Sequence, residues 1–139
     1  MKNTIKLFRF VILIAAIGFL SAGCLTTGKV NTSLEGVWGR EDIVITITGE
    51  SGVFTQINPN AHWHIALSNG SVRIGDLKFR NIVQTGHLKW TTDELSINIG
   101  NYTTSWKNST ITMDESGQTI QVLTSGGVIN PDNTYTRVP

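Results

Sequence analysis

From Glu35 to the C-terminus, apolar and polar residues alternate in short runs. In the run Ile43–Thr48, Ile43, Ile45 and Ile47 fall on one face. Thr46 and Thr48 fall on the other, where Val44 is the only apolar residue. The same alternation recurs in His62–Leu67, Leu95–Ile99, Tyr102–Trp106, Thr110–Met113 and Thr119–Val122. A period of two residues is typical of half-buried β-strands, and no segment of this part shows a convincing helical stripe. The pattern therefore predicts an all-β domain without helices.

Glycine-containing turn signals separate these runs. They lie at Glu50–Gly52, Ser68–Gly70, Thr85–Gly86, Gly100–Asn101 and Glu115–Gly117. Glycine supplies the positive φ that tight hairpin turns require. We therefore expect residues 34–139 to form an antiparallel up-and-down meander of about eight strands. Closure into a small barrel is favoured because it removes exposed edge strands, and a two-sheet sandwich is the alternative.

The N-terminus has the organisation of an export signal. Lys2, Lys6 and Arg9 precede the apolar run Phe10–Leu20. This run is shorter than the roughly 20 residues that a membrane-spanning helix needs, so residues 1–23 are predicted to be a cleavable signal peptide.

The end of this signal, Leu20-Ser21-Ala22-Gly23-Cys24, resembles a relaxed lipobox of bacterial lipoproteins. The resemblance implies cleavage before Cys24 and a lipid anchor on it, a diacylglyceryl group with further acyl chains such as palmitate. The alternative is an ordinary export signal cleaved after Ala22. That would leave an unpaired thiol, because Cys24 is the only cysteine of the chain.

Residues 24–33 are predicted to be the acylated cysteine followed by a flexible tether, because this segment has no apolar periodicity. Leu25 stands where some bacteria use aspartate to retain lipoproteins in the inner membrane. We therefore expect a membrane-anchored lipoprotein of the bacterial cell envelope, at the outer membrane.

Charge excludes one class of partner. The signal holds three of the 11 basic residues and none of the 10 acidic ones, so the mature chain carries a formal net charge of −2. A nucleic-acid partner is not expected, because such partners require a basic surface.

The start of the domain, Gly36-Val37-Trp38, followed by a turn and Gly52-Val53-Phe54-Thr55, resembles the first hairpin of calycin barrels such as lipocalins and avidins. The resemblance covers about twenty residues. It implies a barrel with Trp38 closing one end. Avidins bind biotin through asparagine and serine residues after this tryptophan, and Gly39, Arg40 and Glu41 stand here instead. Biotin binding is therefore not implied.

His62 and His64 form a weak metal-site pattern. On a strand, positions i and i+2 point to one face and could present two imidazoles to a metal, with His87 as a third ligand. The alternative is that both histidines face solvent while Trp63, Ile65 and Leu67 face the core. We favour the second interpretation and expect neither a metal nor another cofactor.

Catalytic patterns are weak. The acidic pairs Glu41-Asp42, Asp93-Glu94 and Asp114-Glu115 lie beside or within predicted turns, where solvated carboxylates are expected. Ser and Thr residues alternate with apolar ones, as outward-facing strand positions do. The segment Val72–Val83 contains Arg73, Lys78 and Arg80, which we interpret as a small basic stripe or as scattered solvated charges. The sequence therefore predicts no enzymatic activity.

The tryptophans are the strongest candidates for a binding site. Trp63, Trp90 and Trp106 alternate with polar neighbours and either fill the barrel or line a recognition surface. We therefore expect a non-catalytic binding module for a small apolar molecule, a glycan or an envelope protein. The alternative is an envelope structural or inhibitor-type protein that acts through a protein interface.

Overall fold

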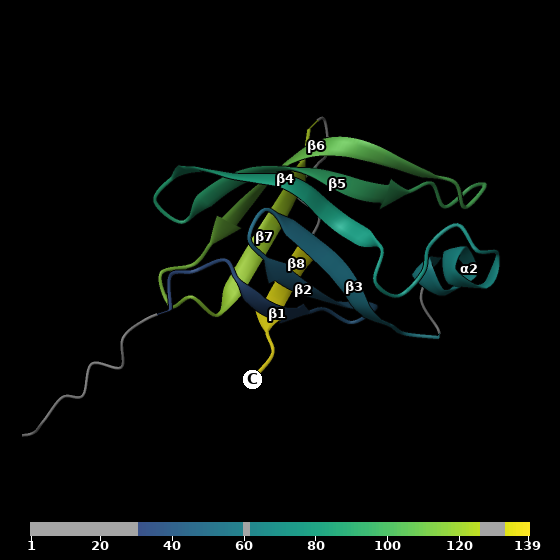
Figure 1. The fold of residues 1–139 in the computed structure, drawn as a ribbon, viewed down its shortest axis with the longest axis horizontal. Coiled ribbons are helices and arrows are strands. Elements are labelled where there is room, and N and C mark those ends of the chain that lie inside the picture. Colours follow the sequence, from purple (N-terminus) through teal and green to yellow (C-terminus); the bar gives the residue numbers. More distant parts are fainter. Residues whose placement is uncertain (1–30, 60–61, 126–132) are drawn as a thin grey trace, which may run out of the picture.

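A computed structural model describes residues 31–59, 62–125 and 133–139 of the chain. The signal peptide, Cys24 and most of the tether predicted above lie outside these residues. Eight strands and one short helix make up the described part (Figure 1). The strands are β1 (Gly36–Gly39), β2 (Ile43–Thr48), β3 (Ser51–Ile57), β4 (Leu77–Gly86), β5 (Lys89–Ile97), β6 (Thr104–Met113), β7 (Thr119–Thr124) and β8 (Thr134–Arg137).

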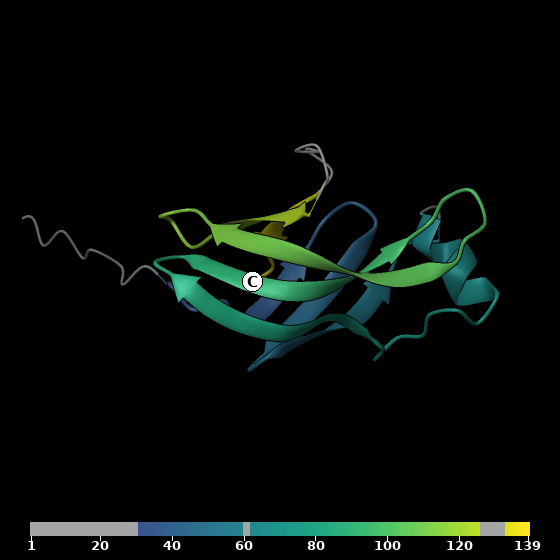
Figure 2. The ribbon, with the colours of Figure 1, turned by 90° about the horizontal axis from the view of Figure 1, so that it is seen from above.

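The strands follow one another around a closed barrel, in which each pairs antiparallel with its neighbours in sequence. Closure is made by β1 and β8, where Trp38 lies opposite Arg137 and Gly39 opposite Thr136. The long strands β4, β5 and β6 run side by side along one wall (Figure 2). The predicted up-and-down barrel is confirmed, and the alternative sandwich is not formed. The runs predicted at Tyr102–Trp106 and Thr110–Met113 contribute to one continuous strand, β6, which begins only at Thr104.

The prediction of a strand at His62–Leu67 is wrong, because His62–Ser68 forms the helix α2. Trp63 and Ala66 are buried, and Leu67 packs against the core, which is the i, i+3, i+4 stripe of an amphipathic helix. Ile65, which the strand interpretation placed in the core, is 40% exposed. A run of six residues fits both periods when apolar residues occupy several neighbouring positions, so the pattern alone was ambiguous.

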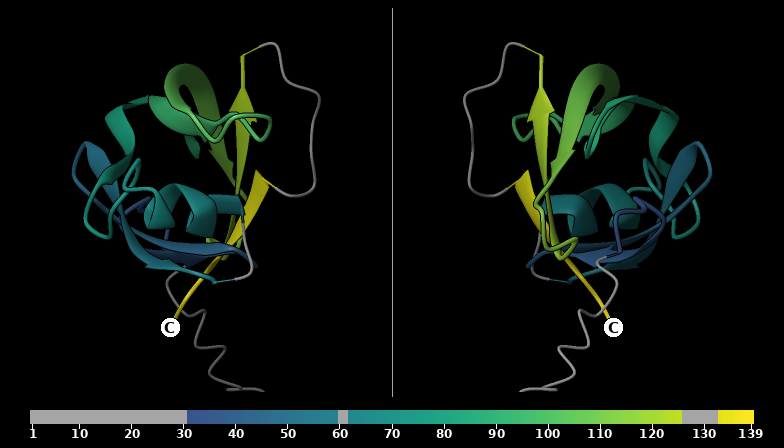
Figure 3. Two further views of the ribbon diagram at one scale, coloured as in Figure 1. Left: turned by 90° about the vertical axis from the view of Figure 1, so that its right-hand side faces the viewer. Right: turned by 90° about the vertical axis from the view of Figure 1, so that its left-hand side faces the viewer.

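The two ends of the barrel are closed differently. At one end, the buried Trp38 donates from its indole Nε1 to the Leu34 carbonyl at 2.8 Å, and the Arg137 guanidinium lies 4.2 Å from its ring centroid. At the other end, α2 lies across the opening (Figure 3). It inserts Trp63, whose ring centroid is 5.0 Å from that of Phe54. The chain enters the described part at the end opposite α2 (Figure 1).

Candidate functional site

The interior of the barrel contains a buried ion pair. Lys78 Nζ lies 2.8 Å from Glu94 Oε1 and donates to the Leu95 carbonyl at 2.6 Å. The other carboxylate oxygen, Glu94 Oε2, accepts hydrogen bonds from the Ser109 hydroxyl at 2.9 Å and the Thr124 hydroxyl at 3.0 Å. The Lys78 side chain is 2% exposed and that of Glu94 6%. Both charges are thus removed from solvent and held by four strands.

A β-bulge places Lys78 inside. The consecutive residues Gly52 and Val53 of β3 pair with Phe79 and Leu77 of β4, which leaves Lys78 as the extra residue. An extra residue interrupts the alternation of side chains. Lys78 and Phe79 are therefore both buried although they are neighbours in sequence. The ammonium lies 4.7 Å from the Trp63 ring centroid, so α2 covers the ion pair from the barrel end.

The pKa values of the two groups reflect burial and pairing. Burial lowers the pKa of the Lys78 ammonium below its ordinary value, and the Glu94 carboxylate offsets this only in part. Burial alone would raise the pKa of Glu94. The charge of Lys78 and the hydrogen bonds from Lys78, Ser109 and Thr124 outweigh that effect and lower it. Glu94 therefore remains ionised in the folded protein at neutral pH.

A second polar group lies toward the same end of the barrel. Arg40 forms an ion pair with Asp42, with 2.9 Å between Nη2 and Oδ2, and its guanidinium lies 5.0 Å from the Tyr135 ring centroid. Tyr135 is completely buried, and its hydroxyl has no hydrogen-bond partner among the described residues. Burial raises the pKa of this phenol.

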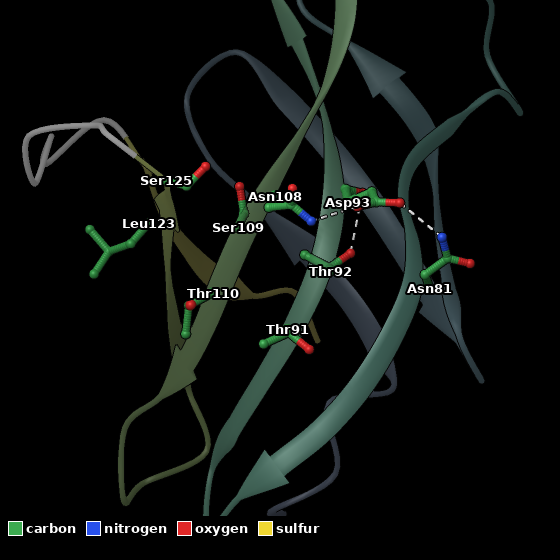
Figure 4. Close-up of a pocket in the computed structure, with 9 residues that line it drawn as sticks. All are labelled: Asn81, Thr91, Thr92, Asp93, Asn108, Ser109, Thr110, Leu123 and Ser125. Atoms are coloured by element: carbon green, nitrogen blue, oxygen red, sulfur yellow. Dashed lines mark hydrogen bonds between the residues drawn. The ribbon is translucent and has the colours of Figure 1, made fainter.

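The barrel also has a groove of about 340 Å³ on the outer face of strands β4 to β7. The register of the strands explains its position, because Asp93 lies opposite Asn108, Thr91 opposite Thr110, and Thr110 opposite Leu123. Side chains opposite each other in register point to the same face of the sheet. The lining consists of Asn81, Thr91, Thr92, Asp93, Asn108, Ser109, Thr110, Leu123 and Ser125 (Figure 4).

Asp93 organises the side chains of this groove. Its Oδ1 accepts from the Asn108 amide at 3.1 Å, and its Oδ2 accepts from the Asn81 amide at 2.8 Å and from Arg80 Nε at 3.3 Å. Figure 4 shows the carboxylate between the two amides. The Arg80 guanidinium also lies 4.1 Å from the ring centroid of Trp106, two residues before Asn108 on β6. Arg80 therefore connects the groove to a half-buried tryptophan on the same outer face.

The three candidate tryptophans do not form one site. Trp63 and Trp90 are 3% and 6% exposed and belong to the hydrophobic core, whereas Trp106 is half-buried and packs against that core. Trp106 lies two residues before Asn108 on β6 and therefore on the same face of the sheet as Asn108. It does not line the groove, and Arg80, which contacts both its ring and Asp93, connects it to the lining.

The histidine pattern does not form a metal site. His62 and His64 are two positions apart on a helix. With 3.6 residues per turn, their side chains point to nearly opposite sides. His87 lies elsewhere, where its Nε2 is 3.8 Å from a Glu115 carboxylate oxygen and both side chains are exposed. Within residues 31–59, 62–125 and 133–139, no three histidine, cysteine or acidic residues are grouped as metal ligands would be.

The expectation of solvated carboxylates is wrong for Asp93 and Glu94, which lie within β5. Trp90, Thr92 and Glu94 are all buried, so the alternation that starts at Trp90 carries Glu94 inside. If the strand is taken to begin at Lys89 and not at Leu95, the alternation predicts a buried Glu94. Asp114 and Glu115 do lie in a turn, as expected. The interpretation of Lys78 as a solvated charge is also wrong, because the bulge that buries it leaves no sign in the hydrophobic pattern.

No helix of the described part is long and apolar enough to cross a membrane. The chain matches no protein-family model, no curated protein and no solved structure.

Proposed function

We propose that this chain is a lipid-anchored, non-catalytic binding module of the bacterial cell envelope, and that its ligand binds on the outer face of β4 to β7. The groove centred on Asp93 carries this proposal. It combines an open depression with polar side chains that Asp93 holds in fixed positions. Such a concave surface with a few oriented polar groups is typical of binding sites.

The interior supports an external site. The buried aromatic residues Trp38, Phe54, Trp63, Phe79 and Trp90 all belong to one hydrophobic core cluster. The Lys78 and Glu94 charges are satisfied by their neighbours and covered by Trp63. A ligand that entered this part of the barrel would have to displace packed side chains, whereas the groove is open to solvent.

The envelope location rests on the signal pattern and on Cys24. Two or more acyl chains anchor a protein stably, since each buried methylene contributes about 0.8 kcal/mol. Labelling growing cells with radioactive palmitate tests this part of the proposal. The wild-type protein should incorporate label, and Cys24→Ser should lose the label and accumulate as an unprocessed precursor. Equal labelling of both proteins would refute the anchor.

Retention by cell-wall material tests the binding face. The protein is purified in nonionic detergent, which removes lipid insertion as a cause of sedimentation, and is mixed with insoluble cell wall. Thr91→Arg places a long side chain in the groove at an exposed position. Thr112→Arg is the matched control, because Thr112 is an exposed threonine on the neighbouring strand that does not line the groove. Thr91→Arg should abolish sedimentation with the wall, and Thr112→Arg should not.

Two results would contradict this binding face. One is equal retention of both arginine variants. The other is retention that is lost when the wall preparation is treated with protease and that Thr91→Arg does not change. Such retention would depend on a protein in the wall. The second result would favour the alternative of an envelope protein that acts through a protein interface elsewhere on the barrel.

A further inference from the structure

The hydrogen-bonding groups of the groove indicate the class of ligand. No hydrogen bond joins the side-chain hydroxyl of Thr91, Thr110 or Ser125 to another residue that the structure describes. Each hydroxyl can both donate and accept. The groove therefore presents several hydroxyl groups that suit a ligand rich in hydroxyls.

The amides and the carboxylate add oriented acceptors. Asn81 and Asn108 use their amide nitrogens to hold Asp93, so their side-chain oxygens point away from that contact. Asp93 Oδ1 accepts one of these bonds, and a carboxylate oxygen can accept about two. An incoming hydroxyl can donate to the remaining position. This arrangement is preorganised, because the donors to Asp93 fix the carboxylate before a ligand arrives.

The charge of the groove argues for a neutral ligand. Asp93 is the one ionisable residue in the lining, and Arg80 neutralises it at 3.3 Å. An anionic polymer would be repelled by Asp93, and the lining contains no cation to offset that repulsion. A cationic peptide would compete with Arg80 and with both amides for a single carboxylate. Neither class is favoured over a neutral polar one.

Trp106 supplies the apolar contact that complements these polar groups. It lies on the outer face of β6, two residues before Asn108, and is half-buried. Arg80 lies over one face of the ring and also binds Asp93, so the ring is held in a fixed position relative to the groove and offers a ligand only the part that Arg80 and the core leave exposed. Aromatic rings present an apolar face to partners that also form hydrogen bonds, and sugar rings combine C–H faces with hydroxyl edges.

We infer that the groove binds a neutral oligosaccharide, with sugar hydroxyls on the Asp93, Asn81 and Asn108 side and a neighbouring sugar unit against the exposed part of Trp106. This inference rests on the proposed function and names the ligand class for the same site. The shared chemistry is that of neutral hexose chains, with or without acetamido groups.

Titration with three neutral hexasaccharides tests the inference. The probes are the β-1,4-linked hexamers of N-acetylglucosamine and of glucose, and the α-1,4-linked hexamer of glucose, each followed by calorimetry and tryptophan fluorescence. At least one hexamer should bind and change the fluorescence of the wild-type protein. Trp106→Phe should lose most of that change, and Thr91→Arg should weaken binding at least tenfold. Thr112→Arg should bind as the wild type does.

The inference is overturned if none of the hexamers binds at 10 mM, a concentration at which even a ligand with a Kd of about 1 mM would be bound. It is also overturned if the two arginine variants bind a hexamer equally. The wall-retention experiment separates the two levels. Retention that Thr91→Arg abolishes, together with no hexamer binding, would refute the oligosaccharide and leave the binding face standing. If the wild-type protein neither sediments with the wall nor binds a hexamer, both the binding face and the oligosaccharide are refuted.

Discussion

The buried pair of Lys78 and Glu94 gives the most quantitative prediction. Lys78→Met removes the ammonium and retains a side chain of similar length, so Glu94 keeps its hydrogen bonds from Ser109 and Thr124 and loses its counter-charge. Glu94→Gln removes the negative charge and leaves an amide oxygen facing Lys78. Removing one partner of a buried pair is strongly destabilising, by about 3 to 5 kcal/mol, because the other charge remains uncompensated.

Proton binding limits the cost of leaving each charge unpaired. Without Lys78, the folded protein can protonate Glu94, and protonating a carboxyl with an ordinary pKa of 4.5 at pH 7 costs about 3 kcal/mol. Without the Glu94 charge, Lys78 can release its proton, which for an ordinary pKa of 10.5 costs about 5 kcal/mol at pH 7. Both values are a substantial fraction of a typical total stability of about 5 to 15 kcal/mol.

These limits give opposite pH dependences. The cost of the unpaired Glu94 charge in Lys78→Met should fall to about 1 kcal/mol at pH 5, because protonating Glu94 costs less free energy as the pH approaches its ordinary pKa. The cost of Glu94→Gln should fall to about 2 kcal/mol at pH 9, as the unfolded lysine approaches its ordinary pKa. In the wild type, the lowered pKa of Glu94 contributes stability above the ordinary pKa. That contribution is lost as the pH falls through the folded value.

Urea unfolding followed by tryptophan fluorescence measures these costs, with Lys78→Met/Glu94→Gln as the closing variant. The double variant has no buried charge at these positions, so it should be more stable than the additive expectation by at least about 2 kcal/mol. Costs below about 1 kcal/mol for both single variants, independent of pH, would refute the placement of the two charges inside the barrel.

Three further substitutions probe the packing, each checked by thermal and urea unfolding. Tyr135→Phe should leave stability unchanged or raise it by up to about 1 kcal/mol, because the buried hydroxyl has no partner among the described residues; a loss of 1 kcal/mol or more would show that it has one. Trp63→Ala should cost about 3 to 5 kcal/mol, whereas Ile65→Ala on the exposed side of α2 should cost less than about 1; equal costs would contradict the orientation of the helix. Gly52→Ala should cost about 1 to 3 kcal/mol, since its Cβ would lie 3.1 Å from Phe79 Cδ2, and a neutral result would contradict this close packing.

The sequence predicted the barrel because alternation is a local property that survives in most strands. Ile43, Ile45 and Ile47 are all buried, and Trp38 is buried at one end. The prediction failed where the pattern of apolar residues fits a strand and a helix equally well. At His62–Ser68 the same apolar residues fit a strand and a helix, and only their packing on the barrel end decides between the two.

The candidate site was harder to predict because it depends on contacts between distant strands. Glu94 is held by residues 15, 16 and 30 positions away in sequence. The side chain of Lys78 turns inward at a bulge, which pattern analysis does not detect. Trp106 was identified as a candidate by residue type, whereas the polar groove beside it depends on the register of β5, β6 and β7. Register between neighbouring strands was not available from the pattern.

Mapping of a bound ligand by NMR tests the central claim most directly. The protein, labelled with ¹⁵N, is titrated with solubilised cell-wall fragments, and the shifted backbone amides are located on the barrel. Our account predicts shifts centred on the groove, at Asn81, Thr91–Asp93, Asn108–Thr110 and Leu123. Shifts centred on α2, or on the Trp38 end of the barrel, would contradict it.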